Sequence, residues 1–137
     1  MSSGLFLIDD DEAIQFIVKS FVSRSGLFEN FDHASNGNEA LKKLINGELG
    51  FSPSVLLIDI NMPVMNGFDF LDELMKLNSK LLKNISIAMF SSSENKDDME
   101  KIKANKKIDV FLKKPFRKEY IEELFRIHNS KTNKKGA

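Results

Sequence analysis

Apolar residues follow two alternating patterns along the chain. Five short runs have the length and composition of buried β-strands, and they cover Leu5 to Ile8, Phe28 to His33, Val55 to Ile58, Ile85 to Phe90 and Ile108 to Leu112. The second run fits the pattern least well. After each run, apolar residues recur at the three- and four-residue spacing of amphipathic helices.

The helical segments differ in how much apolar surface they offer. The segment after the fourth run carries only Met99, Ile102 and Ala104, so we expect its helix to be the most solvated and the easiest to move. Gly26 ends the first segment and Gly47 follows the second. The apolar stripes of the other four are Ile14, Ile17, Val18, Phe21 and Val22; Ala40, Leu41, Leu44 and Ile45; Phe68, Leu71, Leu74 and Met75; and Tyr120, Ile121, Leu124 and Phe125.

This strict alternation of strands and helices predicts an α/β fold. Short connections favour a doubly wound, five-stranded parallel sheet with helices on both faces and right-handed crossovers. Sites in such folds lie beyond the carboxyl ends of the strands. The sequence therefore predicts where a functional site lies before any motif is considered.

Composition narrows the class of protein. The 137 residues suit one domain, and twenty basic and twenty acidic side chains give a formal net charge of zero, which does not favour nucleic acid as a partner. The absence of cysteine excludes disulfides, thiolate zinc sites and a cysteine nucleophile. The beginning, "MSSGLFLIDDDE", has neither the basic flank of a signal peptide nor the length of a membrane span. We therefore expect a cytoplasmic protein that does not bind membranes.

Polar residues that suit phosphoryl chemistry follow four of the predicted strands. Carboxylates gathered at one sheet edge repel one another, and a hard divalent ion such as Mg²⁺ relieves that repulsion. Beside such an ion, the carboxylate of Asp59 is suited to attack phosphorus and form an acyl phosphate, while a lysine and a serine hydroxyl bind phosphate oxygens. These strand-end residues are Asp9 to Asp11, Asp59, Ser91 to Ser93, and Lys113 to Pro115.

Four motifs in this order and spacing carry a resemblance to a known family. They are "LIDDDE", "LLIDINMPVMNGF", "AMFSSS" and "FLKKPF". With them the sequence resembles the receiver domain of two-component response regulators, which has a flavodoxin-like fold. The resemblance implies a receiver domain over residues 4–128, followed by a polar C-terminal tail, residues 129–137, that we expect to be frayed.

The resemblance implies an acceptor and a metal site. Asp59 matches the phosphoacceptor, and Asp10 matches the acidic residue that binds the metal directly. Asp9 matches the neighbour that holds metal-bound water. Asn61 is expected to offer its backbone carbonyl to Mg²⁺.

The resemblance also implies groups that bind and sense the phosphoryl group. Ser91 matches the switch hydroxyl, where the family more often has threonine, and Phe111 matches the switch aromatic residue. Lys114 matches the phosphate-binding lysine, and its peptide bond to Pro115 is expected to be cis. Gly67 matches a glycine for which we expect a backbone conformation closed to other residues.

Several of these residues have simpler interpretations. Asp11 is more typical of a helix N-cap than of a metal ligand, and each residue of the run Ser91 to Ser93, including Ser92 and Ser93, is a candidate to cap the fourth helix. The histidines His33 and His128 lack ligand spacing, which indicates ordinary surface or boundary residues.

The expected function is that of a phosphoacceptor response regulator in a phosphorelay. Its donor would be a histidine kinase or a histidine phosphotransfer protein, and its signal would pass through protein contacts without an output domain. The target would be an unidentified protein or a second copy bound through the fourth helix, fifth strand and fifth helix. We expect assistance of its own phosphorylation and dephosphorylation, but no enzymatic turnover of a separate substrate.

Three alternatives stay open at this point. A phosphorylation-independent protein-binding module has the same fold, although the intact acidic set argues against it. A haloacid dehalogenase-like phosphatase also uses an aspartyl phosphate, but Ala13 stands where its motif has Thr or Val. A calcium-binding protein is the weakest alternative, because "DDDEAIQF" lacks the alternating ligands and central glycine of an EF-hand.

Overall fold

Strands and helices alternate along the whole described chain, as the sequence predicts. The computed structural model describes residues 3–136, with side chains through residue 132. The elements are β1 (Gly4–Ile8), α1 (Glu12–Ser25), β2 (Asn30–Ala34), α2 (Gly37–Ile45), β3 (Val55–Asp59), α3 (Gly67–Leu77), a 3₁₀ turn η1 (Leu81–Asn84), β4 (Ser86–Ser91), α4 (Lys96–Ala104), β5 (Val110–Lys113) and α5 (Lys118–Gly136).

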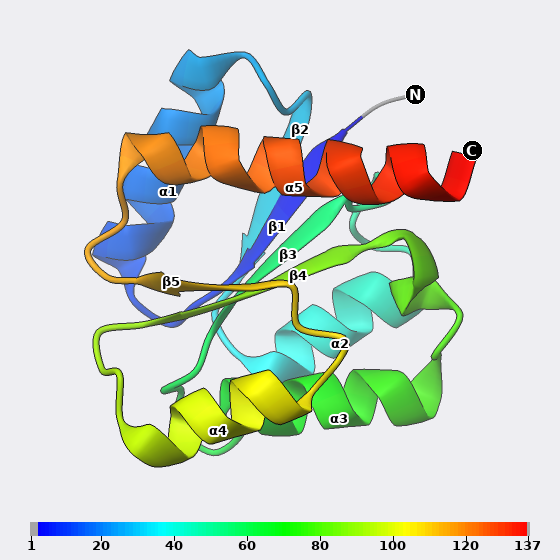
Figure 1. Cartoon of the computed structure of the whole chain (residues 1–137). Coiled ribbons are helices and arrows are strands. Elements are labelled where there is room, and N and C mark those ends of the chain that lie inside the picture. Colours follow the sequence, from blue (N-terminus) through cyan, green and yellow to red (C-terminus); the bar gives the residue numbers. More distant parts are fainter. Residues whose placement is uncertain (1–2, 137) are drawn as a thin grey trace.

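The strands form one parallel sheet in the order β2-β1-β3-β4-β5. Helices α1 and α5 cover one face, and α2, α3 and α4 cover the other (Figure 1). The predicted doubly wound fold is confirmed. Because all strands are parallel, their carboxyl ends meet at the same edge of the sheet.

The three central strands are buried on both faces. Successive side chains point to opposite sides of a strand, so each strand contributes to two separate apolar cores. In β1, Leu5 and Leu7 pack toward α1 and α5, whereas Phe6 and Ile8 pack toward α2 and α3. This two-sided burial is the reason that the central strands appear in the sequence as continuous apolar runs.

Helix ends follow local capping chemistry. The carboxylate of Asp11 accepts hydrogen bonds from the backbone N–H groups of Ala13 (2.9 Å) and Ile14 (3.4 Å), which confirms the predicted N-cap. Gly26 ends α1 with a positive φ of 68°. The cap of α4 is Asn95 rather than a residue of the run Ser91 to Ser93, because its side chain accepts from the N–H of Asp98.

The two weakest sequence patterns correspond to an edge strand and to a helix without a buried residue. Strand β2 is an edge strand that begins at Asn30, two residues after its predicted start, because Phe28 packs into the core before the strand begins. Helix α4 has no buried residue, whereas each other α-helix buries at least two. The prediction that α4 is the most solvated helix is confirmed, and its ease of movement stays a prediction.

The predicted polar tail is part of a helix. Instead of fraying after residue 128, α5 continues to Gly136; Ala137 lies outside the described residues. Contacts at the starts of β4 and β5 hold this extension: the ammonium of Lys131 donates to the carbonyl of Ile85 (2.8 Å), directly before β4, and pairs with Asp109 (3.3 Å), directly before β5. One turn earlier, Nδ1 of His128 lies 3.0 Å from the hydroxyl of Ser86.

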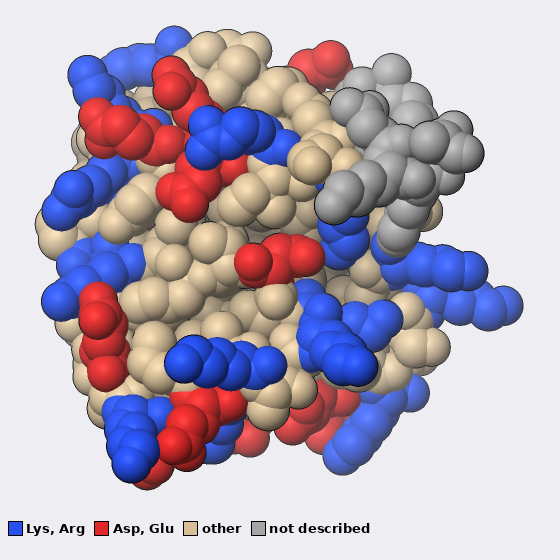
Figure 2. All heavy atoms as spheres, in the orientation of Figure 1, with Lys and Arg blue, Asp and Glu red and all other residues tan. Residues whose placement is uncertain are grey.

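Charged side chains are mixed on the molecular surface. Figure 2 shows lysine and arginine interspersed with aspartate and glutamate on one face, without a broad region of a single sign. Among the described residues, no helix is both long and apolar enough to span a lipid bilayer. The surface in this view therefore lacks the basic stripe that is typical of nucleic-acid-binding domains.

Val64 holds a backbone conformation that suits other residues better. It lies in the loop between β3 and α3 with a φ of 70°, the one positive φ outside glycine among the described residues, and its side chain is fully exposed. A left-handed conformation costs a residue with a Cβ about 1–2 kcal/mol, and asparagine tolerates it better than a β-branched residue.

We therefore expect Val64→Asn to raise the free energy of unfolding by about 1 kcal/mol, because the backbone strain is relieved and no buried contact is lost. Urea denaturation followed by circular dichroism measures this difference. Val64→Ala is the matched control, since it removes the β-branch without adding a polar side chain that can hydrogen-bond to the local backbone, and it should gain less. Equal stability of wild type and Val64→Asn would show that the loop carries no such strain.

Candidate functional site

Four segments bring polar side chains to the carboxyl edge of the sheet. Asp9 and Asp10 follow β1, and Asp59 is the last residue of β3. Ser91 ends β4, where it is paired with Lys113 of β5, so Lys114 lies directly beyond the sheet. The parallel register thus gathers residues that are up to 105 positions apart in the sequence.

The lysine lies between two buried carboxylates. Its Nζ atom is 3.3 Å from Oδ2 of Asp9 and 3.5 Å from Oδ1 of Asp59. Lys114 Nζ also lies 5.0 Å from the centroid of the Phe90 ring. Asp9 is fully buried and Asp59 is 3% exposed, so neither carboxylate has much contact with water. Lys114 therefore partly neutralises a pair of carboxylates that would otherwise face each other unscreened.

Burial makes both carboxylates harder to ionise. Desolvation raises the pKa of Asp59 to about 6, and the charge of Asp9 adds to this effect, while Lys114 and the backbone N–H of Asn61 oppose it. Desolvation also raises the pKa of Asp9, against the lowering effect of its hydrogen bond from the Asp11 N–H. At pH 7, Asp59 remains largely a carboxylate, which is the nucleophilic form.

Three carboxylates form a cluster with the chemistry of a magnesium site. Asp9, Asp10 and Asp59 each offer an oxygen, and these oxygens lie within 4.8 Å of one another. Oδ2 of Asp9 is buried and forms an ion pair with Lys114 (3.3 Å), but no other described group donates a hydrogen bond to it. Mg²⁺ prefers oxygen ligands and keeps several waters, so the exposed side of Asp10 suits it. The residues present therefore fit this ion.

Of the two predicted switch residues, Ser91 is linked to this cluster and Phe111 packs in the adjoining apolar core. Ser91 is fully buried, and its Oγ accepts hydrogen bonds from Nδ2 of Asn61 (3.0 Å) and from the backbone N–H of Ser93 (3.1 Å). Phe111 is half-buried on β5 and packs against the same core as Ile102 of α4. Ser91 is thus hydrogen-bonded to the loop that carries Asn61, while Phe111 packs on the face of the sheet that α4 covers.

Comparison with known proteins identifies the family. Residues 5–126 match the response regulator receiver domain. The chain belongs to this family. It is 29% identical over 123 residues to the chemotaxis protein CheY of Thermotoga maritima, covering 90% of this chain and 94% of that protein. It is also 31% identical over 120 residues to the chemotaxis protein CheY1 of Helicobacter pylori, covering 87% and 90%.

A solved structure agrees with this assignment. The crystal structure of a two component response regulator from Cytophaga hutchinsonii matches with a TM-score of 0.83 and 29% identity, over 94% of this chain and 98% of that one. The receiver fold predicted from the four motifs is therefore confirmed across nearly the whole chain. Receiver domains typically use Mg²⁺ at an acidic site, and the Asp9, Asp10 and Asp59 cluster of this receiver domain corresponds to such a site.

Two loop features of the receiver domain were predicted, one correctly. The peptide bond between Lys114 and Pro115 is cis, as expected. The reason given for Gly67 was wrong, since its φ is not positive. Glycine is needed there for space instead: a Cβ atom on Gly67 would lie 2.6 Å from the backbone oxygen of Asp59 and 3.0 Å from side-chain carbons of Ile58 and Met89. Any larger residue would push the loop away from the end of β3.

Gln15 is a site residue that the sequence analysis missed. It is buried on α1, and its Nε2 donates to the backbone oxygen of Asp9 (2.7 Å) and to the hydroxyl of Ser35 (3.2 Å). It therefore ties the end of β1, next to the acidic cluster, to the loop after β2. One signal was available in the sequence: Gln15 lies three residues before Val18 and seven before Val22, which is the spacing of one buried helix face.

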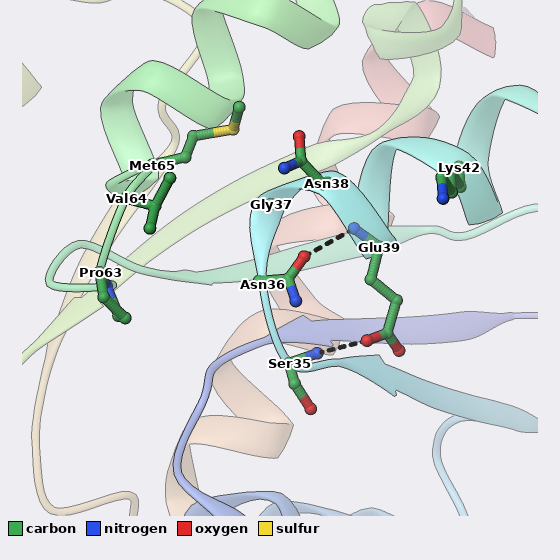
Figure 3. Close-up of a pocket in the computed structure, with 9 residues that line it drawn as sticks. All are labelled: Ser35, Asn36, Gly37, Asn38, Glu39, Lys42, Pro63, Val64 and Met65. Atoms are coloured by element: carbon green, nitrogen blue, oxygen red, sulfur yellow. Dashed lines mark hydrogen bonds between the residues drawn. The ribbon is translucent and has the colours of Figure 1, made fainter.

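A hollow of about 560 Å³ beside the receiver site has a structural explanation. It lies between the β2–α2 and β3–α3 loops (Figure 3). Its main polar groups already serve as the cap of α2, because Asn36 accepts from the N–H of Glu39 and the Glu39 carboxylate accepts from the N–H of Ser35. None of the three clustered aspartates lines it. The acidic cluster therefore remains the candidate site.

Proposed function

We propose that this receiver domain accepts a phosphoryl group on Asp59 from a histidine kinase or a histidine phosphotransfer protein. One observation carries the proposal: Asp59 is a buried carboxylate that shares Lys114 with Asp9 inside a cluster of three acids. A carboxylate at the end of a buried strand is costly unless it has a task or a partner. Acceptance of phosphate gives this arrangement a chemical purpose.

In the transfer step, a carboxylate oxygen of Asp59 attacks the phosphorus of a phosphohistidine. The new P–O bond makes an acyl phosphate as the P–N bond breaks, and the nitrogen keeps the electron pair and takes up a proton. Lys114 then pairs with a phosphoryl oxygen, which it reaches from its present position beside Oδ1 of Asp59. The phosphoryl group is later lost by hydrolysis. Water attacks phosphorus, the P–O bond to Asp59 breaks, inorganic phosphate leaves, and the carboxylate is regenerated.

The metal-binding residues in this proposal are Asp10, Asp9, Asp59 and the backbone carbonyl of Asn61. Mg²⁺, when bound, supplies positive charge that neutralises the transferring phosphoryl group. Asp10 would hold the ion directly and Asp9 would hold it through water, in line with a buried Oδ2 atom of Asp9 that accepts no other hydrogen bond. These contributions assist the domain's own phosphorylation and dephosphorylation, and no separate substrate is turned over.

The proposed output is a change in protein contacts. When Asp59 carries phosphate, Ser91 moves toward it and gains a charge-assisted hydrogen bond, and Phe111 turns into the space that is vacated. Helix α4, which has no buried residue, then repacks at little cost. The altered surface of α4, β5 and α5 is where we place the downstream protein or a second copy of the chain.

Mapping of the phosphorylated residue tests the proposal. Wild-type protein incubated with acetyl phosphate and Mg²⁺ should gain one phosphoryl group, detected by intact mass and assigned to Asp59 by peptide mass spectrometry. A parallel sample with EDTA should gain far less. Absence of the label would favour a phosphorylation-independent binding module, and a label on another residue would contradict the acceptor assignment.

Ser91→Ala is expected to separate phosphorylation from signalling. The variant should still be labelled at Asp59, but the amide resonances of residues 95–107 should shift less than in wild type when beryllofluoride, a stand-in for the phosphoryl group, is added with Mg²⁺. Ser92→Ala, which changes an exposed serine, is the control and should behave as wild type. Full-size shifts in Ser91→Ala would contradict the switch while leaving the acceptor assignment intact.

A further inference from the structure

Asn61 donates hydrogen bonds to both Asp59, the predicted acceptor, and Ser91, the predicted switch residue. Its backbone N–H donates to Oδ1 of Asp59 (3.1 Å), and its side-chain amide donates to Oγ of Ser91 (3.0 Å). The sequence analysis gave this residue a task only through its backbone carbonyl. Its side chain therefore has a contact that the proposed chemistry does not use.

The hydroxyl of Ser91 is held by two donors at once. A serine oxygen has two lone pairs, and here one accepts from Asn61 and the other from the backbone N–H of Ser93. Ser91 is fully buried in the intact site, so no water competes with these two donors there. Movement of this oxygen toward Asp59 must break or rearrange these hydrogen bonds.

The two donors restrain Ser91 in different ways. Ser93 follows two residues later on the same segment, so its N–H moves together with Ser91 when that segment moves. Asn61 belongs to the loop after β3 and lies thirty positions away in the sequence. The amide of Asn61 is therefore the hydrogen bond that ties the hydroxyl to a separate part of the site.

We propose that the side-chain amide of Asn61 is a positioning group that restrains Ser91 in its unphosphorylated place and so sets how readily phosphate on Asp59 changes α4. The effect on α4 rests on the proposed function, because it requires phosphate on Asp59. The hydrogen bond from Asn61 to Ser91 is present in the unmodified protein. Breaking one such hydrogen bond should favour the rearranged state about fivefold.

Asn61→Ala tests the restraint directly, because Asn61 is exposed and its truncation leaves no buried cavity. In unmodified protein, the scalar couplings that report the Ser91 side-chain torsion should indicate one rotamer in wild type and an average of several in Asn61→Ala. Ser92→Ala serves as the matched control and should keep the wild-type couplings. Unchanged couplings in Asn61→Ala would overturn the proposal, whether or not Asp59 accepts phosphate.

A beryllofluoride titration tests the consequence. With Mg²⁺ in excess, the concentration that gives half of the α4 amide shift should be about fivefold lower in Asn61→Ala than in wild type. In a Ser91→Ala background the same change should have no effect, because the bond is already absent. An equal effect in both backgrounds would overturn the proposal by showing that the amide acts on the phosphoryl group or the metal.

The two measurements separate this inference from the proposed function. Averaged rotamers in Asn61→Ala, combined with no response of wild type to beryllofluoride, would support the restraint and contradict phosphorylation at Asp59. A wild-type response to beryllofluoride with an unchanged midpoint in Asn61→Ala would contradict the restraint and leave the phosphoacceptor assignment in place.

Discussion

Asp59→Asn is expected to eliminate the phosphoryl label that acetyl phosphate and Mg²⁺ place on the wild-type protein. An amide has nearly the size of a carboxylate, but it is a far poorer nucleophile and cannot form the acyl phosphate. Phosphate incorporation measured by intact mass gives the result, and circular dichroism confirms that the fold is retained. Persistence of a normal label that is stable in acid and labile in base would show that Asp59 is not the acceptor.

The same substitution should stabilise the protein at neutral pH. Burial raises the pKa of Asp59 from 3.8 to about 6, which corresponds to roughly 3 kcal/mol of unfavourable free energy for the ionised form in the folded state. This net shift already includes the attraction to Lys114, but the buried amide of the variant needs hydrogen-bond partners of its own, which offsets part of the gain. We therefore expect an increase on the order of 2 kcal/mol in the free energy of unfolding at pH 7 without Mg²⁺.

The stability that Asp59→Asn adds should decrease as the pH falls. Between pH 6 and pH 4 the folded protein binds a proton at Asp59 more readily than the unfolded chain does, so the penalty of the wild type fades as pH falls. The advantage of Asp59→Asn should be full above about pH 6 and nearly gone at pH 4. Urea denaturation across this range, with the exposed Asp72→Asn as control, measures it. A gain that grew toward acid pH would contradict the assigned pKa.

Asp10→Ala is expected to weaken Mg²⁺ binding and phosphorylation together. Asp10 is the exposed member of the acidic cluster and the predicted direct ligand, so its loss removes one oxygen from the site. We expect at least a tenfold weaker affinity for Mg²⁺, on the order of the loss seen when a supporting residue of a metal site is removed. A Mg²⁺ titration followed by amide NMR measures the affinity.

Asp11→Ala is the matched control for the metal assignment. The Asp11 carboxylate caps α1 and is not part of the acidic cluster. Its removal should lower the free energy of unfolding by about 1 kcal/mol and leave Mg²⁺ affinity close to wild type. If both variants lost Mg²⁺ affinity equally, the choice of ligand would be wrong.

The sequence alone determined the fold and most of the candidate site. Hydrophobic periodicity is a local property of the chain, so it predicted the five strands and the five α-helices, and the strand-helix alternation then predicted the parallel sheet. Because the carboxyl ends of parallel strands share one edge, the residues after β1, β3, β4 and β5 were expected to meet. The structure brings Asp9, Asp10, Asp59, Ser91 and Lys114 to that edge.

Several features were decided only by contacts between distant segments. The last residues of α5 look like a loose tail in sequence, but the contacts of Lys131 with Ile85 and Asp109 continue the helix. Gly67 is required by the closeness of the Asp59 backbone oxygen, which no local pattern reveals. Each of these depends on the packing of two elements against each other.

The electrostatics and the hydrogen bonds of the site also depend on contacts between distant segments. The pKa of Asp59 depends on how deeply the strand end is buried and on where Asp9 and Lys114 lie. The bond from Asn61 to Ser91 joins two loops thirty residues apart. Sequence patterns determine which side chains reach the edge of the sheet, whereas desolvation and hydrogen-bond geometry depend on distances of a few ångströms that only the folded chain defines.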